Sequence, residues 1–284
     1  MPIVFSNVFH CYNPKSPYSF DALNDINLTL EEGKFIAIVG RTGSGKTTLV
    51  QHMNALLRPT QGKVEVNGYV NSANKKERTK KIGGLRKEVG MVFQFPEYQL
   101  FEETVLKDVS FGPKNFGASQ EEADKAAKDA MARVGLDELF YERSPFQLSG
   151  GEKRKVAIAG ILAMQPKILV VDEPTAGLDP QASRDTMELF KEILATGTTI
   201  ILVSHDMDIV AEYADEVVVM ENGKVVKQCA PEELFGLSLT EYSLDNPHTY
   251  KFAEELRKKG LNIPTTSLRN VDELAKAIKE NIHG

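Results

Sequence analysis

The stretch that decides the fold is Phe35–Val50, FIAIVGRTGSGKTTLV. Its first five residues form a continuous apolar run, which predicts a buried strand of a parallel sheet. From Lys46 onward, apolar residues recur at helical spacing. Between the two lies Gly40–Thr47, GRTGSGKT, which matches the pattern GxxxxGK[ST]. A strand, a glycine-rich loop and a helix in direct succession predict a binding site for the phosphates of a nucleoside triphosphate.

Each residue type in this loop has a chemical reason. Glycines let consecutive backbone N–H groups turn inward around phosphate oxygens, and the helix N-terminus adds a partial positive charge. The Lys46 ammonium can reach the β- and γ-phosphates, and the Thr47 hydroxyl can ligate Mg²⁺. We therefore predict a nucleoside triphosphate with Mg²⁺ at Gly40, Arg41, Thr42, Gly43, Ser44, Gly45, Lys46, Thr47 and Thr48; the resemblance described below makes this nucleotide ATP.

A pair of acids ends a second apolar strand. The run ILVV is followed by Asp172 and Glu173, and parallel sheets bind ligands at the carboxyl ends of their strands. Two neighbouring carboxylates are costly there unless a cation or a proton compensates them. We predict Asp172 as part of the Mg²⁺ shell. We predict Glu173 as the general base or water-positioning group for attack on the γ-phosphate.

A third motif, Leu148–Glu152 (LSGGE), opens a helix. A hydroxyl, flexible backbone N–H groups and a helix dipole make an anion site, although a serine before a helix is also an ordinary N-cap. One nucleotide cannot easily use two helix N-termini separated by a long insertion. Ser149, Gly150, Gly151 and Glu152 are therefore expected to serve the γ-phosphate bound to another subunit, in a dimer with composite sites.

Composition narrows the class of protein. The 284 residues are 42% hydrophobic and 26% charged, with a net charge of −6, so a soluble globular chain that binds no nucleic acid is expected. Two distant cysteines predict neither a disulfide framework nor a zinc site, which suits a reducing, cytosolic setting. No secretory signal is recognisable, and no apolar run approaches the ~20 residues of a membrane span.

The rest of the chain alternates strands and helices, which predicts an α/β protein with a mainly parallel sheet. VGMVFQ, KILVVDEP and TTIILVSHD are the other buried-strand candidates. We divide the chain into an ATPase domain, residues 1–228, with a helical subdomain at about 95–165, and a small α-rich C-terminal extension, residues 229–284.

These motifs together resemble the ATPase subunits of ABC transporters. GRTGSGKT, LSGGE and ILVVDE correspond to the family's Walker A, signature and Walker B motifs, in the family's order. The resemblance implies a P-loop NTPase fold of the ABC type, with a mixed sheet core plus a helical subdomain. It also adds three residues. The Q-loop Gln94 is expected to sense the metal and the attacking water, and the D-loop Asp179 is expected to reach across the dimer. The switch histidine His205 is expected to contact the γ-phosphate.

Two further residues follow from this resemblance. An aromatic residue upstream of the loop is expected to stack on adenine; Tyr12 fits best by position, and Tyr18 and Phe20 lie in the same segment. Glu152 stands where the family commonly has Gln, which leaves only the detailed contact at that position open.

Two stretches are similar to energy-coupling factor transporters, which import vitamins or transition-metal ions. They are FQFPEYQLFEETVLKDVSFGPKNFG and VAIAGILAMQPKILVVDEPTAGLDP, and the C-terminal extension resembles the family's dimer-supporting domain. The insertion NPKSPYSFDAL resembles the second of two paralogous ATPases that pair in such complexes. A homodimer and a heterodimer with a paralogous ATPase subunit are both compatible with the sequence. The alternative function is a soluble ABC-type ATPase of DNA repair or translation.

The resemblance implies membrane partners. A transmembrane coupling protein is expected to dock near Gln94 and to present an arginine to Glu97, Glu102 or Glu103, and a separate membrane subunit would select the cargo. The acidic residues have a plainer interpretation as a solvated face. The chain would thus be peripheral, at the cytoplasmic face of the cell membrane.

Overall fold

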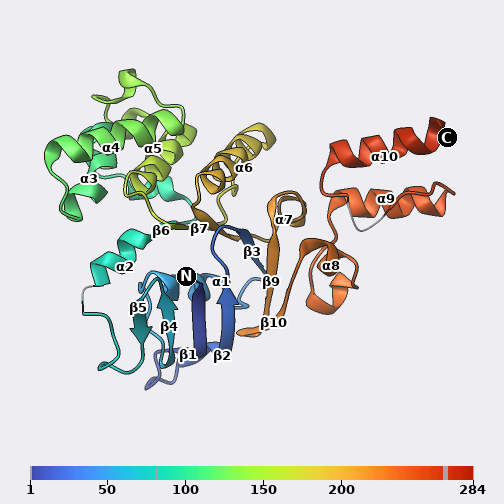
Figure 1. Cartoon of the computed structure of the whole chain (residues 1–284), viewed down its shortest axis with the longest axis horizontal. Helices are drawn as coiled ribbons and strands as arrows, with labels where there is room; N and C mark the ends of the chain where they lie inside the picture. Colours follow the sequence, from blue (N-terminus) through green and yellow to red (C-terminus); the bar gives the residue numbers. More distant parts are fainter. Residues whose placement is uncertain (1, 81, 265–267, 284) are drawn as a thin grey trace.

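The computed structural model describes residues 2–80, 82–264 and 268–283. In this part of the chain the strands form two sheets (Figure 1). The first sheet is antiparallel, with the order β2-β1-β4-β5. Its strands are β1 (Ile3–Tyr12), β2 (Phe20–Leu30), β4 (Gln61–Val66) and β5 (Tyr69–Ser72).

The second sheet has the order β10-β9-β3-β8-β7-β6. Its strands are β3 (Phe35–Val39), β6 (Val89–Val92), β7 (Ile168–Asp172), β8 (Thr199–Val203), β9 (Glu216–Glu221) and β10 (Lys224–Cys229). All neighbouring strands are parallel except β9 and β10, which form an antiparallel hairpin. The predicted α/β fold with a mixed sheet is confirmed.

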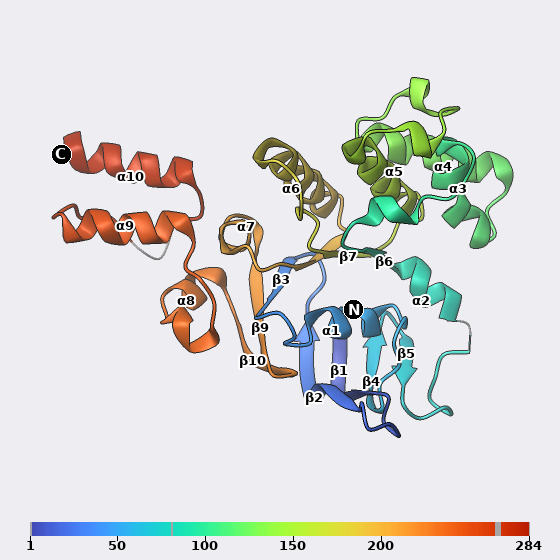
Figure 2. The ribbon, with the colours of Figure 1, turned by 180° about the vertical axis from the view of Figure 1, so that it is seen from behind.

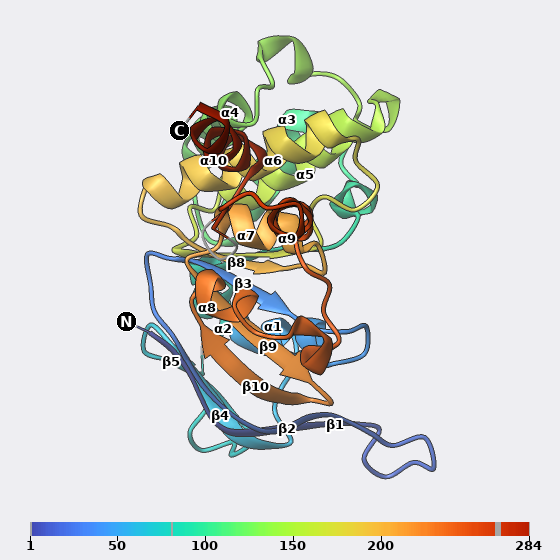
Figure 3. The ribbon, with the colours of Figure 1, turned by 90° about the vertical axis from the view of Figure 1, so that its right-hand side faces the viewer.

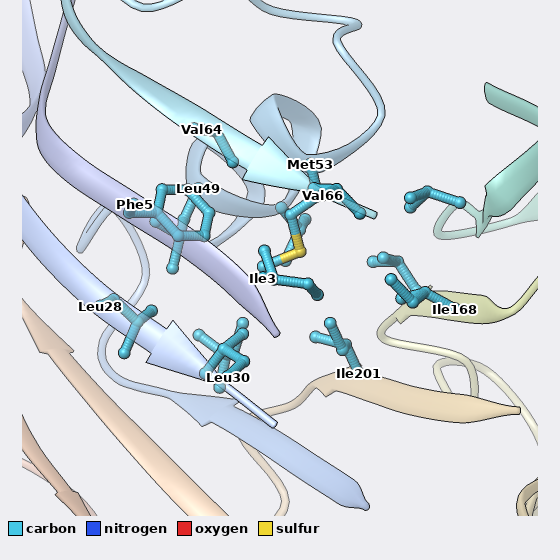
Figure 4. Close-up of a cluster of buried hydrophobic side chains, with 14 of the residues drawn as sticks. Ile3, Phe5, Leu28, Leu30, Leu49, Met53, Val64, Val66, Ile168 and Ile201 are labelled. Atoms are coloured by element: carbon cyan, nitrogen blue, oxygen red, sulfur yellow. The ribbon is translucent and has the colours of Figure 1, made fainter. Parts of the chain in front are cut away.

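Helix α1 (Lys46–Met53) is packed between the two sheets. Its buried residues Leu49 and Met53 meet Ile3 of β1 and Ile201 of β8 in one core (Figure 4). The strand β3 is buried over its whole length, as its apolar run predicts. This core fixes the glycine-rich loop, because the loop joins the buried end of β3 to a buried helix.

A group of helices lies beside the second sheet, in the stretch expected to be helical (Figures 1 and 2). Its long members pack on one another around a separate apolar cluster. They are α3 (Val105–Asn115), α4 (Gln120–Arg133) and α5 (Gly150–Leu162). Helix α2 (Ile82–Glu88) and the short turn η1 (Pro96–Gln99) precede them, and the short turns η2 (Glu138–Phe140) and η3 (Pro145–Gln147) lie between α4 and α5. Helix α4 begins with the pattern Ser-x-x-Glu, and Ser119 and Glu122 form a reciprocal capping box there.

Two helices follow the acidic strand and its neighbour, α6 (Pro180–Ala195) and α7 (Met207–Tyr213). The C-terminal part then contains α8 (Pro231–Phe235), η4 (Leu239–Tyr242), α9 (His248–Lys258) and α10 (Val271–His283). Figure 3 shows the molecule from the right-hand side of Figure 1, and α9 and α10 lie at the front in this view.

Val271, Leu274, Ala275 and Ile278 share one face of α10 by their helical spacing, and this apolar face is only partly covered. Leu274 is buried against α9, and Ile278 is half-buried. Val271 and Ala275, which share the helical spacing, are exposed, Val271 to 71%.

Candidate nucleotide-binding and hydrolysis site

The predicted site residues follow neighbouring parallel strands. The phosphate loop follows β3, His205 follows β8, Glu173 follows β7 and Gln94 follows β6, and these strands are adjacent in that order. Since the carboxyl ends of parallel strands lie at one edge of the sheet, the topology brings residues from four distant parts of the sequence to that edge.

The phosphate loop wraps around its own lysine. The Lys46 ammonium donates to the carbonyl oxygens of Gly40 (2.7 Å) and Arg41 (3.1 Å). Burial lowers the pKa of Lys46, and the nearby Glu173 and Asp172 partly offset this effect. Gly40 has φ +145°, and a Cβ there would lie 2.2 Å from the carbonyl oxygen of Met220, so only glycine fits.

The donor set of this loop fits a magnesium–phosphate group. The Thr47 hydroxyl donates to the Asp172 carboxylate over 3.0 Å, so two oxygen ligands of the kind that Mg²⁺ prefers already face each other. Burial raises the pKa of Asp172, against which the hydrogen bond from Thr47 acts. The buried Ser44 hydroxyl has no hydrogen-bond partner among the described residues, which suits a loop built to hold a ligand.

Glu173 and His205 are in direct contact. Nδ1 of His205 lies 2.8 Å from a carboxylate oxygen of Glu173, and the imidazole is largely exposed. The backbone N–H of Glu173 donates to the carbonyl of Val203, and its φ is +49°. A left-handed conformation at a non-glycine residue is strained, and such strain gathers at functional sites.

Among the aromatic candidates, Tyr12 is attached to the phosphate-loop helix. Its hydroxyl lies 3.2 Å from the hydroxyl of Thr48. Tyr18 and Phe20 are 84% and 58% exposed. The structure thus places Tyr12 beside the loop, as its sequence position suggested.

Sequence reasoning missed a histidine pair behind Tyr12. Nε2 of His52 lies 3.2 Å from Nδ1 of His10, and Nδ1 of His52 lies 2.7 Å from the carbonyl oxygen of Thr48. Burial lowers the pKa of His52 to about 4. The available signal was helical spacing, because His52 shares the buried face of α1 with Leu49 and Met53.

The signature residues begin α5. Ser149 is its N-cap and forms a capping box with Glu152, in which the Ser149 N–H donates to the carboxylate (2.8 Å) and the Glu152 N–H to the hydroxyl (3.3 Å). Asp179 caps α6 by accepting from the N–H groups of Gln181 and Ala182. Ser149, Gly150, Gly151 and Asp179 are exposed and lie outside the network of contacts around Lys46.

The acidic residues near Gln94 differ from one another. Glu97 is paired with Arg154 of α5 at 3.2 Å, and Glu103 is paired with Lys107 at 2.6 Å on the surface. Glu102 is half-buried in the segment before α3. Glu97 therefore already has an ion-pair partner within the chain, which the sequence did not reveal.

Comparisons with known proteins agree with this geometry, which defines a P-loop ATPase of the ABC class. The ABC transporter family model matches residues 23–176. The energy-coupling factor transporter ATP-binding protein EcfA2 of Lactobacillus delbrueckii subsp. bulgaricus is 49% identical over 286 residues, covering 100% of this chain and 99% of that protein. The protein of the same name from Enterococcus faecalis is 50% identical over 99% of this chain and 98% of its own length.

Two solved structures share the fold. CbiO1 of Clostridium perfringens, described as part of the ABC transporter complex cbiONQ, is 36% identical with a TM-score of 0.73, covering 91% of this chain and 96% of that one. The ATP-binding cassette MJ0796, solved as a dimer with ADP and Pi, is 29% identical with a TM-score of 0.70, covering 80% and 98%.

The chain belongs to the ABC transporter ATPase family and, within it, to the ATP-binding proteins of energy-coupling factor transporters. It is thus an ATP-binding, ATP-hydrolysing subunit. Among the described residues, none of the helices combines the length and apolar character that crossing a bilayer requires.

Proposed function

We propose that this chain hydrolyses ATP at the cytoplasmic face of the membrane and so powers uptake of a vitamin or a transition-metal ion. The observation that supports this most is the sheet edge at which Lys46, Glu173, His205 and Gln94 follow adjacent parallel strands. The full-length similarity to energy-coupling factor subunits supports the transport role.

In the proposed mechanism the chain's own groups bind and orient the substrate. The loop N–H groups and Lys46 hold the β- and γ-phosphates after the ammonium leaves the carbonyls of Gly40 and Arg41. Glu173 accepts a proton from the attacking water, and His205, already 2.8 Å away, fixes that carboxylate and faces the γ-phosphate. Tyr12 stacks on adenine in this proposal, and the contact of its hydroxyl with the Thr48 hydroxyl near the start of α1 supports that assignment.

Thr47, Asp172 and Gln94 would hold Mg²⁺. The ion would neutralise charge on the β- and γ-phosphate oxygens. The contact between Thr47 and Asp172 supports this assignment, and Gln94 follows the strand next to the one that ends at Asp172.

The functional unit in this proposal is a dimer, with a paralogous subunit or with a second copy. Ser149, Gly150, Gly151 and Glu152 of one subunit would meet the γ-phosphate held by the other, and Asp179 would reach across. Two features support it. The signature residues Ser149, Gly150 and Gly151 are exposed at a helix N-terminus, and the C-terminal helices expose Phe252, Val271 and Ala275.

A membrane coupling protein would dock on the segment after Gln94. This segment exposes Tyr98 (84%) and Phe101 (56%), and it includes Glu97, Glu102 and Glu103. Exposed aromatic side chains beside acidic ones suit a partner that brings an arginine.

The test is purification of the tagged full chain from detergent-solubilised membranes, with identification of all bound subunits by mass spectrometry. We expect a polytopic coupling protein, a second ATPase subunit and a cargo-selecting membrane protein. Recovery in a purely soluble pool, without membrane subunits, would instead support an ATPase of DNA repair or translation.

A further inference from the structure

Arg154 is a charged residue that the motifs do not account for, and it is nearly inaccessible to solvent. It lies on α5, with 6% of its surface exposed. Its Nε and Nη2 atoms donate to the two carboxylate oxygens of Glu97, over 3.2 and 3.3 Å. Its Nη1 atom donates to the backbone carbonyls of Pro174 (3.3 Å) and Ala176 (3.1 Å). The guanidinium group therefore binds the Glu97 carboxylate through Nε and Nη2 and the two backbone carbonyls through Nη1.

These partners lie in the segments that serve the hydrolysis site. Pro174 directly follows Glu173, and Glu97 lies three residues after Gln94. Arg154 itself lies five residues after Ser149 in the chain. One side chain therefore joins the signature helix, the segment after Gln94 and the loop after Glu173.

The two loops that Arg154 holds have strained backbones. Glu173 has φ +49° and Phe95 has φ +56°. Such conformations persist only where the surroundings impose them. Carbonyls of the first loop and a carboxylate of the second meet on the same cation, so a shift of either loop changes the hydrogen bonds available to the other.

A purely structural role would not require an arginine at this place. A buried ion pair is often matched by apolar residues of similar volume, so burying one is weak evidence for stability. Arginine differs from lysine because its planar fork binds a carboxylate with two parallel bonds and still offers further donors. With this geometry Arg154 binds both loops at once, so its hydrogen bonds depend on the position of the Glu97 segment relative to the loop after Glu173.

We propose that Arg154 is a positioning residue for ATP hydrolysis, which places the Glu173 loop according to the position of the Glu97 segment. Arg154 touches no reacting atom and acts through the Pro174 and Ala176 carbonyls. When a partner docks beside Glu97 and displaces this segment, the Arg154 guanidinium transmits the displacement to the loop that follows Glu173. This last step rests on the proposed function, because it requires a membrane partner at the Glu97 segment.

The experiment compares ATP turnover of the full chain alone with its turnover in the purified transporter complex. The variants are Arg154→Gln, Arg154→Lys, Glu97→Gln and the double variant Glu97→Gln/Arg154→Gln. Lys155→Gln is the matched control, because it removes the same charge from an exposed neighbour on α5. Turnover is divided by the number of ATP molecules bound, measured by titration, which removes any inactive fraction from the comparison.

We expect Arg154→Gln to bind ATP with an unchanged KM and to lose turnover by on the order of 10- to 100-fold, as for a slightly misplaced catalytic group. Arg154→Lys should fall between this variant and the natural chain. Glu97→Gln should also lose turnover, by a smaller factor than Arg154→Gln, because Arg154 keeps its hydrogen bonds to the Pro174 and Ala176 carbonyls, and it should lose the stimulation that the complex gives. The double variant should be no worse than Arg154→Gln, because both residues act through one link.

Two results would overturn the proposal: turnover per bound ATP that is unchanged in Arg154→Gln, or turnover that falls by the same factor in the chain alone and in the complex with stimulation kept. If Arg154→Gln does not fold, Arg154→Lys and Glu97→Gln give the same comparison. Failure of the proposed function is a separate result, in which the unmodified chain finds no membrane partner and shows no stimulation. Basal turnover then still tests the positioning of the Glu173 loop.

Discussion

At the scale of single residues, Glu173, the proposed base, has a strained backbone conformation, and its carboxylate lies against His205. We predict that Glu173→Gln keeps ATP binding, because the phosphate loop and Lys46 are unchanged. Turnover should fall by about 10²- to 10⁴-fold, the usual contribution of a general base. Glu192→Gln, which neutralises an exposed carboxylate on α6, is the control. Hydrolysis by Glu173→Gln at the natural rate would show that another group accepts the proton.

The buried His52 gives a prediction for stability against pH. Its pKa falls from 6.5 when unfolded to about 4 when folded, chiefly because burial disfavours the charged form. Below pH 6.5 the unfolded chain therefore binds the proton and the folded chain does not. Stability is full above this pH and declines as the pH falls toward 4, by up to about 1.4 kcal/mol per pH unit.

We expect His52→Gln to reduce the fall in the free energy of unfolding between pH 7.5 and 5, measured by urea titration at each pH. His248→Gln is a control of opposite sign. Asp208 raises the pKa of His248, so its contribution is present at acid pH and is lost as the pH rises through the folded value. Removing it should make the decline on acidification steeper. Equal pH profiles for His52→Gln and the natural chain would contradict this account.

At the scale of elements, the sequence predicts what depends on local pattern. The strand–loop–helix unit, the Asn67–Gly68 hairpin between β4 and β5, and the capping box at Ser119 all follow from residue type and spacing. Helix ends are less predictable: α5 ends at Leu162 and α1 ends at Met53, although further apolar residues follow each of them in the sequence. Small errors of this kind are expected where tertiary packing decides the last turn.

Interactions between distant elements were not predictable in the same way. Arg154 lies in KRK, where nothing in the residue type separates it from Lys153 and Lys155. Only its position four residues before the buried Ile158 places it on the inward face of α5. Its partners lie 57 and 20 residues away, so the contact exists only once η1 and β7 meet α5. The proposed role of Ser149 in a composite site likewise requires a second subunit, so it does not follow from the local sequence pattern of one chain.

At the scale of the whole molecule, each chain holds a complete phosphate loop and exposes its signature residues Ser149, Gly150 and Gly151 at the start of another helix. If the γ-phosphate joins two subunits, ATP must bind the closed dimer better than the open chains, and hydrolysis must remove that preference. The closed state should therefore accumulate when ATP binds and is not cleaved. This condition is met by the Glu173→Gln variant.

We predict that ATP shifts the solution mass of Glu173→Gln from one chain to two, alone or with a paralogous ATPase subunit, as measured by light scattering. Adding Ser149→Arg should abolish the shift while ATP still binds, because a long cation would occupy the space of the partner's γ-phosphate. Lys155→Gln in the same background should leave the shift intact. A dimer that forms equally with ADP, or that survives Ser149→Arg, would contradict a composite site. In that case the apolar surface at Phe252 and Val271, 52% and 71% exposed, would have to hold the subunits together without nucleotide.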